Sequence, residues 1–316
     1  MILVVSYAGE DHTAAVTDRL EAAGREVARI DVGAFPSLAT LSLELDASAE
    51  HHVVTTDTGM VDLVRARVAW WRRVRPYQLD DALSEHSERS FALSETAQAV
   101  GGMLDALPCT WVNPRAADEA AHRKPYPLSV ARQLGIPVPR TLVTNRPEDA
   151  RSFCEGLGLG RVVFKSLLAS WDWRETRLVE AEDMDRLDSV RYAPVIFQEY
   201  IPGMDLRVTV VGEQVFAAEI DATATSYPVD MRVVVGESAV RPVQLPTDVH
   251  DGLLALMKQL DLVYGAIDLR RDANGQHVFL EVNPAGLWLF AEQLTGLPIT
   301  AAVADTLMAL DVDSRG

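Results

Sequence analysis

The chain of 316 residues has few cysteines and few long apolar runs. Its two cysteines, Cys109 and Cys154, lie far apart and in no metal or redox spacing, which favours a reducing cytoplasm and inert thiols. No apolar run reaches the roughly 20 residues that cross a membrane. The start, MILVVSYAG, lacks the basic segment and the cleavage site of a signal peptide. We therefore expect a cytoplasmic protein that does not associate with membranes.

Positive charge is also scarce, because 29 basic residues face 46 acidic ones, for a net charge of −17. This balance argues against binding to nucleic acid, and the acidic surface either attracts a basic partner or keeps the chain in solution. No GxGxxG motif follows the first strand, so nothing signals a dinucleotide. The seven histidines show neither triad nor metal spacing, and we nominate no protein nucleophile.

The length allows two or three subdomains with real cores, and a hydrophobic content of 48% is that of an ordinary globular protein. Residues 1–45 alternate strand and helix, which predicts a small parallel α/β domain. The segment 111–114 marks a boundary after this domain.

The most informative stretch is residues 263–292, where two runs of alternating β-forming residues flank Asn274 and Gly275. Asn-Gly is the strongest short signal of a β-hairpin. A two-residue turn at this place pairs Ala273 with Gln276. Any loop of even length keeps that register, and a loop of odd length breaks it.

The same register puts Asp268 directly opposite Glu281, and strand alternation places Asn283 on the same face. Two carboxylates whose Cβ atoms lie about 5 Å apart repel each other unless a cation lies between them. Two carboxylates and an amide oxygen are a ligand set suited to Mg²⁺ with bound phosphates. The alternative is a solvated strand face with ordinary acids, but the apolar flanking residues favour the metal.

Cationic residues stand at three other places. Arg72 and Arg73 end a strand after paired tryptophans, where they either bind carboxylates or phosphate or compensate nearby acids. Lys124 precedes a helix, which suits an anion at the positive end of the helix dipole, although many such lysines are simply solvated. Lys165 lies on a strand that is apolar on both sides, so it must pair or reach a ligand.

The order of these features needs one explanation that uses all of them. Two lysines precede a polar strand end at Gln198 and Glu199, then an Asp-x-Arg at 205–207, and last the acid-acid-amide set. A nucleotide supplies that explanation. Lysines neutralise phosphates, a hinge strand binds adenine through its backbone, an acid holds ribose, and the final set holds the phosphate-bound Mg²⁺.

Motifs along nearly the whole chain carry a family resemblance. They are WWRR at 70–73, WVNPRAADEAAHRKP at 111–125, IPVPRTLVTN at 136–145, VVFKS at 162–166, DLRVTVVGEQVFAAEID at 205–221, GAIDLR at 265–270, FLEVNPAGLWLFAE at 279–292 and TGLPI at 295–299. On these motifs the chain resembles the ATP-grasp superfamily and, within it, the graspetide synthetases, which are microviridin-type macrocyclising peptide ligases. The run EVNPAG followed by an aromatic pair and Glu292 is specific for this branch, and the acid-acid-amide set is specific only to the superfamily.

The resemblance implies an α/β (α+β) ATP-grasp fold in three parts. A parallel α/β domain at residues 1–112 precedes a central ATP-grasp subdomain at 113–199. A C-terminal subdomain at 200–316 carries the metal site, and the two α+β subdomains clasp ATP between them.

The resemblance also implies roles, position by position. In chain order the matches are the phosphate lysines Lys124 and Lys165, the adenine hinge Gln198, Glu199 and Tyr200, the ribose region at Asp205, the γ-phosphate arginine Arg207, and the Mg²⁺ ligands Asp268, Glu281 and Asn283. Arg207, Lys165 and Lys124 are therefore the catalytic candidates. Arg72, Arg73 and Arg232 fall in family segments near the peptide substrate.

The implied reaction uses ATP and Mg²⁺ to phosphorylate Asp or Glu side chains of a ribosomal precursor peptide. A Thr, Ser or Lys side chain then displaces phosphate and closes an ester or amide crosslink. The implied partners are a precursor with a leader and an acidic, hydroxyl-rich core, and a second copy in a homodimer. Two alternatives are a ligase that adds a free amino acid to a peptide terminus and a non-catalytic nucleotide-binding chaperone. The glycine-free segment SLLASWDWRET after Lys165 supports the latter.

Overall fold

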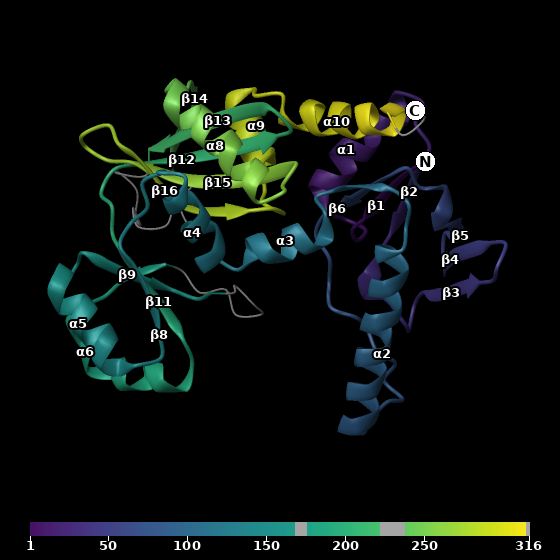
Figure 1. Cartoon of the computed structure of the whole chain (residues 1–316), viewed down its shortest axis with the longest axis horizontal. Helices are drawn as coiled ribbons and strands as arrows, with labels where there is room; N and C mark the ends of the chain where they lie inside the picture. The colour runs from purple at the N-terminus through teal and green to yellow at the C-terminus, as the bar shows by residue number, and fades with distance from the viewer. Residues whose placement is uncertain (168–175, 222–237, 314–316) are drawn as a thin grey trace. The chain divides into compact units, whose positions relative to one another are not determined.

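The structure is a computed structural model of the chain, and it describes residues 1–167, 176–221 and 238–313 (Figure 1). Parallel and antiparallel sheets combine with helices, which confirms the predicted mixed α/β class. By their contacts the residues form two compact units, Met1–Arg115 with Thr300–Gly316 and Ala116–Ile299. The finer division into three parts at 112/113 and 199/200 stays a prediction.

The first unit is built on a parallel sheet with the strand order β2-β1-β6-β7. Its elements are β1 (Ile2–Val5), α1 (Asp11–Ala22), β2 (Val27–Ile30), β6 (Val68–Trp71), α2 (His86–Asp105) and β7 (Thr110–Val112). Strand β1 is buried along its whole length, as a central strand of a parallel sheet must be. The strand-helix alternation predicted for this region is confirmed.

A second, antiparallel sheet, which was not predicted from the sequence, lies in the same unit. It consists of β3 (Thr40–Leu45), β4 (Glu50–Thr56) and β5 (Gly59–Asp62), with the short 3₁₀ helices η1 (Val32–Ala34) and η2 (Leu63–Arg65) on either side in the chain. Most of β3 is exposed, so the usual signal of a buried strand face is weak here.

The last helix, α10 (Ile299–Asp313), belongs to the first unit from Thr300 onward. Its buried Asp311 lies 3.8 Å from the Met1 amino group and forms ion pairs with Arg25 at 3.3 Å and Arg67 at 2.8 Å. Because Met1, Arg25 and Arg67 precede β1, β2 and β6, these contacts join the end of the chain to the N-terminal ends of these strands.

The second unit contains two antiparallel sheets (Figure 1). The first has the order β10-β9-β11-β8, and its elements are β8 (Thr141–Thr144), α5 (Pro147–Leu157), β9 (Val162–Lys165), β10 (Arg177–Leu178), α6 (Ala181–Arg186), η3 (Leu187–Tyr192) and β11 (Val195–Glu199). Its core joins Cys154 of α5 and Leu187 of η3 to Val162 and Phe197 of the sheet.

The other sheet has the order β14-β13-β12-β15-β16. The elements that form and surround it are α3 (Arg115–His122), α4 (Pro125–Gln133), β12 (Met204–Val211), β13 (Gln214–Asp221), β14 (Ala239–Val243), α8 (Thr247–Gln259), β15 (Tyr264–Arg271), β16 (His277–Asn283) and α9 (Leu289–Thr295). One face packs on α8 and α4, since Leu206, Val208 and Ile267 join Leu256 and Leu128 in one core. The opposite face of β12 and β15 carries the polar residues.

The turn between β15 and β16 differs from the predicted one. Asp272 N–H donates to the Gln276 carbonyl at 2.9 Å, and Arg271 pairs with His277, so three residues form the loop instead of two. Asp272 Oδ1 also accepts the N–H groups of Asn274 and Gln276 at 2.9 and 2.8 Å, which stabilises this longer turn. The predicted pairing of Ala273 with Gln276 is therefore wrong.

A β-bulge between the turn and the site restores the predicted register. The odd loop shifts the pairing by one residue as far as Leu269, which faces Phe279. The register then changes at Leu280, and Asp268 faces Glu281 as predicted. A bulge places one extra residue on one strand and turns its side chains. Phe279 consequently lies in the core, while Leu280 and Glu281 line a pocket.

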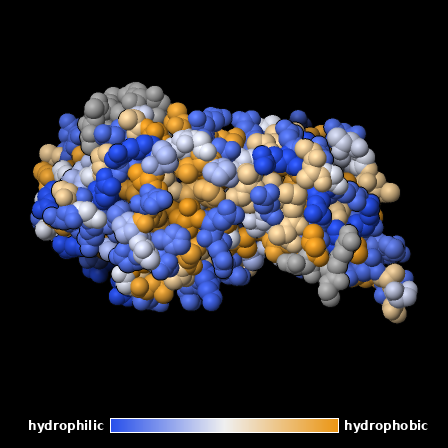
Figure 2. Space-filling model, turned by 90° about the horizontal axis from the view of Figure 1, so that it is seen from above, coloured by the Kyte–Doolittle hydropathy of each residue, from blue (hydrophilic) through white to orange (hydrophobic). Residues whose placement is uncertain are grey.

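The surface mixes polar and apolar residues, in keeping with a mean hydropathy of +0.04. Figure 2 shows one face on which hydrophilic residues surround smaller apolar patches. Within the described ranges, no helix combines the length and the apolar character that crossing a membrane requires.

Candidate functional site

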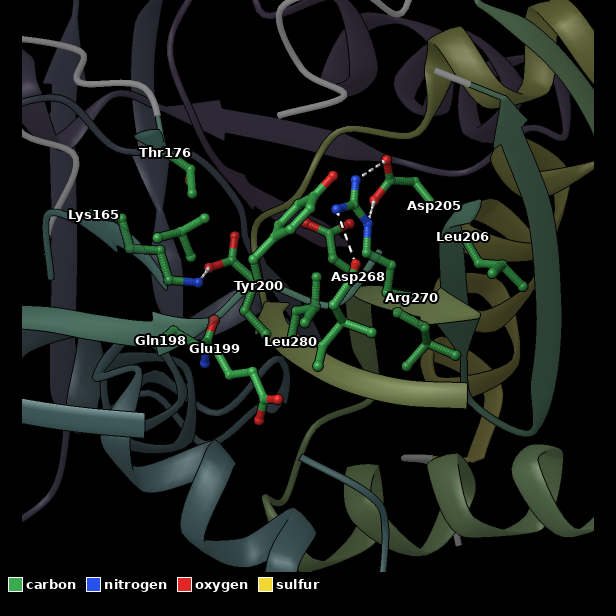
Figure 3. A pocket seen from close by; sticks show the side chains of 14 residues that line it. Lys165, Thr176, Gln198, Glu199, Tyr200, Asp205, Leu206, Asp268, Arg270 and Leu280 are labelled. Carbon is green, nitrogen blue, oxygen red and sulfur yellow. Dashed lines mark hydrogen bonds and ion pairs between the residues drawn. The ribbon is translucent and has the colours of Figure 1, made fainter. Parts of the chain in front are cut away.

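A pocket in the second unit contains most of the predicted site residues (Figure 3). Strands β9 and β11 of one sheet and β12, β15 and β16 of the other contribute to its walls. It encloses about 640 Å³, including solvent at its mouth. The lining residues that the sequence had singled out are Lys165, Gln198, Glu199, Tyr200, Asp205, Asp268 and Glu281.

Glu281 lies between the two predicted phosphate lysines. Lys124 Nζ donates to Glu281 Oε2 at 2.8 Å, and Lys165 Nζ lies 3.5 Å from the same oxygen. Lys124 is the N-cap residue of α4, as its place before a predicted helix had suggested. Lys165 ends β9, and its side chain points into the pocket (Figure 3). Lys124 and Lys165 thus meet at the carboxylate of Glu281, although Lys124 lies 157 residues before Glu281 in the chain.

Asp268 is held by the predicted γ-phosphate arginine. Arg207 Nη1 donates to Asp268 Oδ1 at 2.6 Å, and the two residues are direct partners across β12 and β15. Arg207 Nη2 donates to the Leu287 carbonyl at 3.0 Å. Burial opposes the charged guanidinium, but Asp268, with smaller contributions from Tyr264 and Glu281, outweighs burial and raises the pKa of Arg207 above its ordinary value.

The ion pairs at Glu281 and at Asp268 together suit the binding of a magnesium–triphosphate. Three cations, Lys124, Lys165 and Arg207, surround the carboxylates of Asp268 and Glu281, which leaves positive charge for a polyphosphate. Two facing carboxylates are hard oxygen ligands of the kind Mg²⁺ prefers. Among the described residues, His, Cys, Asp and Glu form no metal-binding group of three. Any metal here therefore also needs amide, phosphate or water oxygens.

Asn283, the predicted amide ligand, follows Glu281 by two residues at the exposed end of β16. Its Oδ1 accepts the N–H of Ala285 at 2.9 Å, which orders the turn after the strand. A Cβ added to Gly286 in this turn would lie 3.2 Å from Arg207 Nη2. The Gly286 carbonyl accepts a hydrogen bond from the Tyr264 hydroxyl at 2.8 Å. The turn therefore packs closely against the arginine.

Asp205, the predicted ribose-region acid, is bound by an arginine that sequence reasoning missed. Arg270 Nε and Nη2 donate to the two carboxylate oxygens of Asp205 at 2.9 and 2.8 Å, and Nη1 donates to the Ile201 carbonyl at 3.2 Å. Its guanidinium lies 5.1 Å from the centre of the Tyr200 ring (Figure 3). Burial lowers the pKa of Arg270, but Asp205 and Tyr200 together outweigh burial, so the pKa is raised.

The predicted adenine hinge forms the end of β11 beside this ion pair. Gln198 is buried, and its Nε2 donates to the Thr141 hydroxyl at 3.0 Å. The N–H groups of Glu199 and Tyr200 donate to the carbonyls of Arg140 at 2.8 Å and Arg161 at 2.9 Å. An adenine base would therefore have to be bound by other backbone groups of this segment.

Arg72 and Arg73 lie in the first unit, directly after β6. Arg72 is buried, with Nε 3.8 Å from Glu10 Oε2, whereas Arg73 is exposed. Burial raises the pKa of Glu10, but the hydrogen bonds from His12 and Thr13 and the charge of Arg72 outweigh it and lower the pKa to about 2. The pair Glu10–Arg72 thus contributes to the fold, and the substrate-binding roles of Arg72 and Arg73 stay predictions.

Two features singled out in the sequence fall outside the described residues. Arg232, the third predicted peptide-binding arginine, lies in the segment 222–237. Most of the glycine-free segment after Lys165 lies in 168–175.

Strand alternation could have identified Arg270, since it lies two residues after Asp268 and on the same face. Leu280 had no such signal, because it enters the pocket only through the bulge.

Two family matches cover almost the whole chain. Residues 1–119 match the family described as MvdD pre-ATP grasp domain, and residues 121–307 match the RimK-like ATP-grasp domain. The second match spans more than half of the chain, so the chain belongs to the RimK-like ATP-grasp family. It is an ATP-grasp ligase, and enzymes of this class use ATP and Mg²⁺. Among curated protein sequences, none matches the chain significantly.

Solved structures extend this result. Macrocyclase MdnC of Microcystis aeruginosa MRC, bound with precursor peptide MdnA, is 30% identical with a TM-score of 0.86, over 98% of this chain and 99% of that chain. Macrocyclase MdnB of the same organism is 28% identical with a TM-score of 0.82, and the match covers 97% of this chain and 98% of MdnB. A RiPP-associated ATP-grasp ligase of Chryseobacterium gregarium, with ADP, leader and core peptide, is 24% identical with a TM-score of 0.87, over 98% and 96%. The predicted fold and family resemblance are confirmed.

Proposed function

We propose that this ATP-grasp ligase crosslinks side chains of a ribosomal precursor peptide. The observation that carries the proposal is the pairing of Asp268 with Glu281 across one hairpin, amid Arg207, Lys124 and Lys165. This arrangement provides the charges that a magnesium–triphosphate needs. The similarity over nearly the full length to MdnC, a macrocyclase bound with its precursor peptide, supports a peptide as the second substrate.

The residues of the pocket take separate roles in this proposal. Asp268, Glu281 and Asn283 would hold Mg²⁺, which would supply positive charge against the triphosphate. Lys124 and Lys165, which lie at Glu281, would neutralise phosphate charge, and Arg207 would stabilise the γ-phosphoryl group. In the same proposal Gln198, Glu199 and Tyr200 flank the adenine, and Asp205 with Arg270 flanks the ribose. Arg72, Arg73 and Arg232 bind the peptide.

The reaction proceeds in two displacements. An Asp or Glu carboxylate oxygen of the precursor attacks the γ-phosphorus of ATP, the bond to the bridging oxygen breaks, and ADP leaves. The resulting acyl phosphate is attacked at its carbonyl carbon by a Thr or Ser hydroxyl or a Lys amine. Phosphate leaves and the nucleophile loses its proton, so each crosslink removes one water from the peptide. The pocket supplies charge neutralisation, positioning and protection from bulk water.

The proposal includes partners and a location. The precursor has a leader that binds the enzyme and an acidic, hydroxyl-rich core that reacts. The structure of the Chryseobacterium gregarium ligase contains a leader and a core peptide, which supports the division. We also propose that the enzyme is a homodimer and acts in the cytoplasm.

Mass spectrometry of the purified chain with ATP, Mg²⁺ and candidate precursors tests the proposal. We expect the precursor mass to fall by one water for each ADP that is formed. Asp268→Asn and Glu281→Gln should each abolish this loss. Glu213→Gln, in the exposed turn between β12 and β13, is the matched control and should crosslink at the wild-type rate.

The same experiment separates the alternatives. A gain in mass by one amino acid would identify a ligase that extends a peptide terminus. Binding of the precursor without any ADP release would identify a non-catalytic chaperone. Either result, or full activity of the Asp268 and Glu281 variants, would overturn the proposal.

A further inference from the structure

Three large apolar residues, Leu287, Phe290 and Leu294, lie at the surface around helix α9. Leu287 is 39% exposed and Leu294 is 54% exposed, while Phe290 is partly buried. Phe290 and Leu294 are four residues apart in α9, so they lie on the same side of the helix. Leu287 stands in the turn just before the helix. We call these three residues the apolar stripe.

The packing of α9 depends on other side chains of the same segment. Trp288 is fully buried, and its ring centre lies 5.4 Å from that of Tyr264. Ala291, one turn further on, is buried as well. The exposed leucines of the stripe therefore add little to the stability of this segment. Single exposed leucines are common on protein surfaces, so the position of these decides what they do.

The stripe adjoins the proposed γ-phosphate arginine. The Leu287 carbonyl accepts a hydrogen bond from Arg207 Nη2 at 3.0 Å, and the guanidinium lies 6.0 Å from the centre of the Phe290 ring. Arg207 in turn binds Asp268, which lines the nucleotide pocket. Neither Leu287 nor Phe290 lines that pocket. The stripe thus borders Arg207 and not the nucleotide itself.

This position suits the second substrate. In phosphoryl transfer the attacking and leaving oxygens lie roughly in line on opposite sides of the phosphorus. ADP leaves on the side of the pocket, so the peptide carboxylate must approach the γ-phosphorus from outside it. The surface next to Arg207 and outside the pocket is the stripe. The acyl phosphate then forms beside Leu287 and Phe290.

An acyl phosphate can also react with water. The water oxygen attacks the carbonyl carbon, the bond to the phosphate oxygen breaks, and phosphate leaves. Loss of protons from the added water restores the carboxylate, so ATP is consumed and no crosslink forms. An apolar surface offers no hydrogen bond to hold a water molecule, and it gains by covering itself with the aliphatic part of a peptide.

We propose that Leu287 and Phe290 determine whether the acyl phosphate closes a crosslink or is hydrolysed. They bind the aliphatic part of the reacting peptide segment beside Arg207 and keep water from the intermediate. The inference rests on the proposed function for the peptide and the reaction. The occupant of the stripe follows from its continuity with the site, since the reacting segment is the substrate that must lie next to Arg207.

The ratio of ADP formed to crosslinks closed tests this inference. Asparagine has nearly the shape of leucine and retains the backbone carbonyl that Arg207 binds. We expect Leu287→Asn to raise the ratio at least about threefold, while ADP release with precursor stays within about twofold of wild type. Leu287→Met, which keeps the position apolar, should retain the wild-type ratio. Leu134→Asn is the matched control, because Leu134 is 42% exposed at the end of α4.

A reaction in water labelled with heavy oxygen identifies the hydrolysed intermediate. Attack of water on the acyl phosphate leaves the label in an Asp or Glu carboxyl of the precursor. Mass spectrometry of the uncrosslinked precursor should find more label with Leu287→Asn than with wild type or Leu134→Asn. Without precursor, all of these chains should release ADP at the wild-type rate.

Three results would overturn the inference. They are a wild-type ratio in Leu287→Asn, an equal rise in Leu134→Asn, and a rise in ADP release without precursor, which would mean that the stripe protects ATP instead of the acyl phosphate. Failure of the proposed function looks different, because the wild-type chain would then form no crosslink in any precursor. If the wild type crosslinks and Leu287→Asn keeps its ratio, only this inference fails.

Discussion

At the scale of single residues, Arg270 connects two of the proposed nucleotide-binding residues. It binds both carboxylate oxygens of Asp205 and lies over the Tyr200 ring. Lysine keeps the charge but cannot form the two-pronged bond or the stacked contact. We therefore expect Arg270→Lys to raise the KM for ATP about tenfold and to leave kcat within about twofold. Steady-state kinetics of ADP release measure both constants.

Arg241→Lys is the control for this prediction. Arg241 also binds a carboxylate through two nitrogens, that of Glu219, and neither residue lines the pocket. An equal rise in KM for both variants would mean that Arg270 acts through general stability.

Glu10 makes the stability of the first unit depend on pH. Its pKa falls from 4.5 to about 2 in the folded chain. A carboxyl whose pKa is lowered by folding stabilises the fold at any pH above its pKa in the unfolded chain. This stabilisation is lost as the pH falls through its pKa in the folded chain. The shift corresponds to a contribution on the order of 3 kcal/mol. We expect Glu10→Gln to lower the Tm at pH 7 and the difference from wild type to shrink between pH 4.5 and 2, as followed by tryptophan fluorescence.

A constant difference in Tm across that pH range would contradict this account of Glu10. Glu213→Gln, which changes an exposed carboxylate, should leave the Tm unchanged at every pH.

For some charged residues, the sequence indicated a need for a partner or a ligand. Lys165 stood out because a lysine on an apolar strand needs a partner, and it lies 3.5 Å from Glu281. The structure also places Arg207 on Asp268 and Lys124 on Glu281. The contact of Glu10 with Arg72 could not be predicted, because no motif or strand register in the sequence links these two positions.

At the scale of elements, the turn after β16 depends on Gly286. A Cβ placed there would lie 2.3 Å from the Ala266 Cβ and 3.2 Å from Arg207 Nη2. Gly286→Ala must therefore push the turn away from β15 and shift the arginine. We expect a loss of about 1–3 kcal/mol in the free energy of unfolding and at least about a tenfold loss in kcat, measured by denaturant unfolding and ADP release.

Gly102→Ala is a suitable control, because a Cβ at this position in α2 meets no atom within 4 Å. Alanine should stabilise the exposed helix by about 1 kcal/mol or less and leave kcat unchanged. A Gly286→Ala variant as active as Gly102→Ala would show that the turn does not position Arg207.

The hairpin shows how far an element can be predicted. Asn274-Gly275 correctly located the turn and the facing acids, but not the turn's length. Asp272 stabilises a three-residue loop through its side chain, and the bulge at Leu280 then corrects the register. The three-residue loop and the bulge each shift the strand pairing by one residue, in opposite directions, so the two shifts cancel. The facing of Asp268 and Glu281 was thus predicted correctly although the turn was not.

At the scale of the whole molecule, the end of the chain stabilises its beginning. Asp311 of α10 is buried and binds Arg25 and Arg67 of the first unit. Asp311→Asn leaves these arginines without their charged partner, at a cost of about 1–3 kcal/mol. We expect faster hydrogen exchange in residues 2–5 and 27–30, measured by mass spectrometry. Residues 204–211 of the second unit should exchange at the wild-type rate.

Asp305→Asn, an exposed position on the same helix, should leave all of these rates unchanged. Slower or unaltered exchange at residues 2–5 in Asp311→Asn would contradict a stabilising role for α10.

The order of the motifs predicted the mixed α/β architecture of the chain, and the predicted division into three domains stays a prediction. Strand-helix alternation indicated the parallel sheet, and the later strands indicated antiparallel sheets. Residues 300–316 were assigned by sequence to the C-terminal part, whereas their contacts group them with the first unit. Long-range ion pairs such as those of Asp311 lie within this group, and no local sequence pattern predicts them.

The central claim is that Asp268 and Glu281 together hold the metal of a nucleotide. Electron paramagnetic resonance of Mn²⁺, used in place of Mg²⁺ and titrated with ADP present, tests it most directly. The account predicts that wild type and Glu213→Gln bind one Mn²⁺ per chain, and that Asp268→Asn and Glu281→Gln weaken this binding at least about tenfold. Wild-type Mn²⁺ affinity in both carboxylate variants would contradict it.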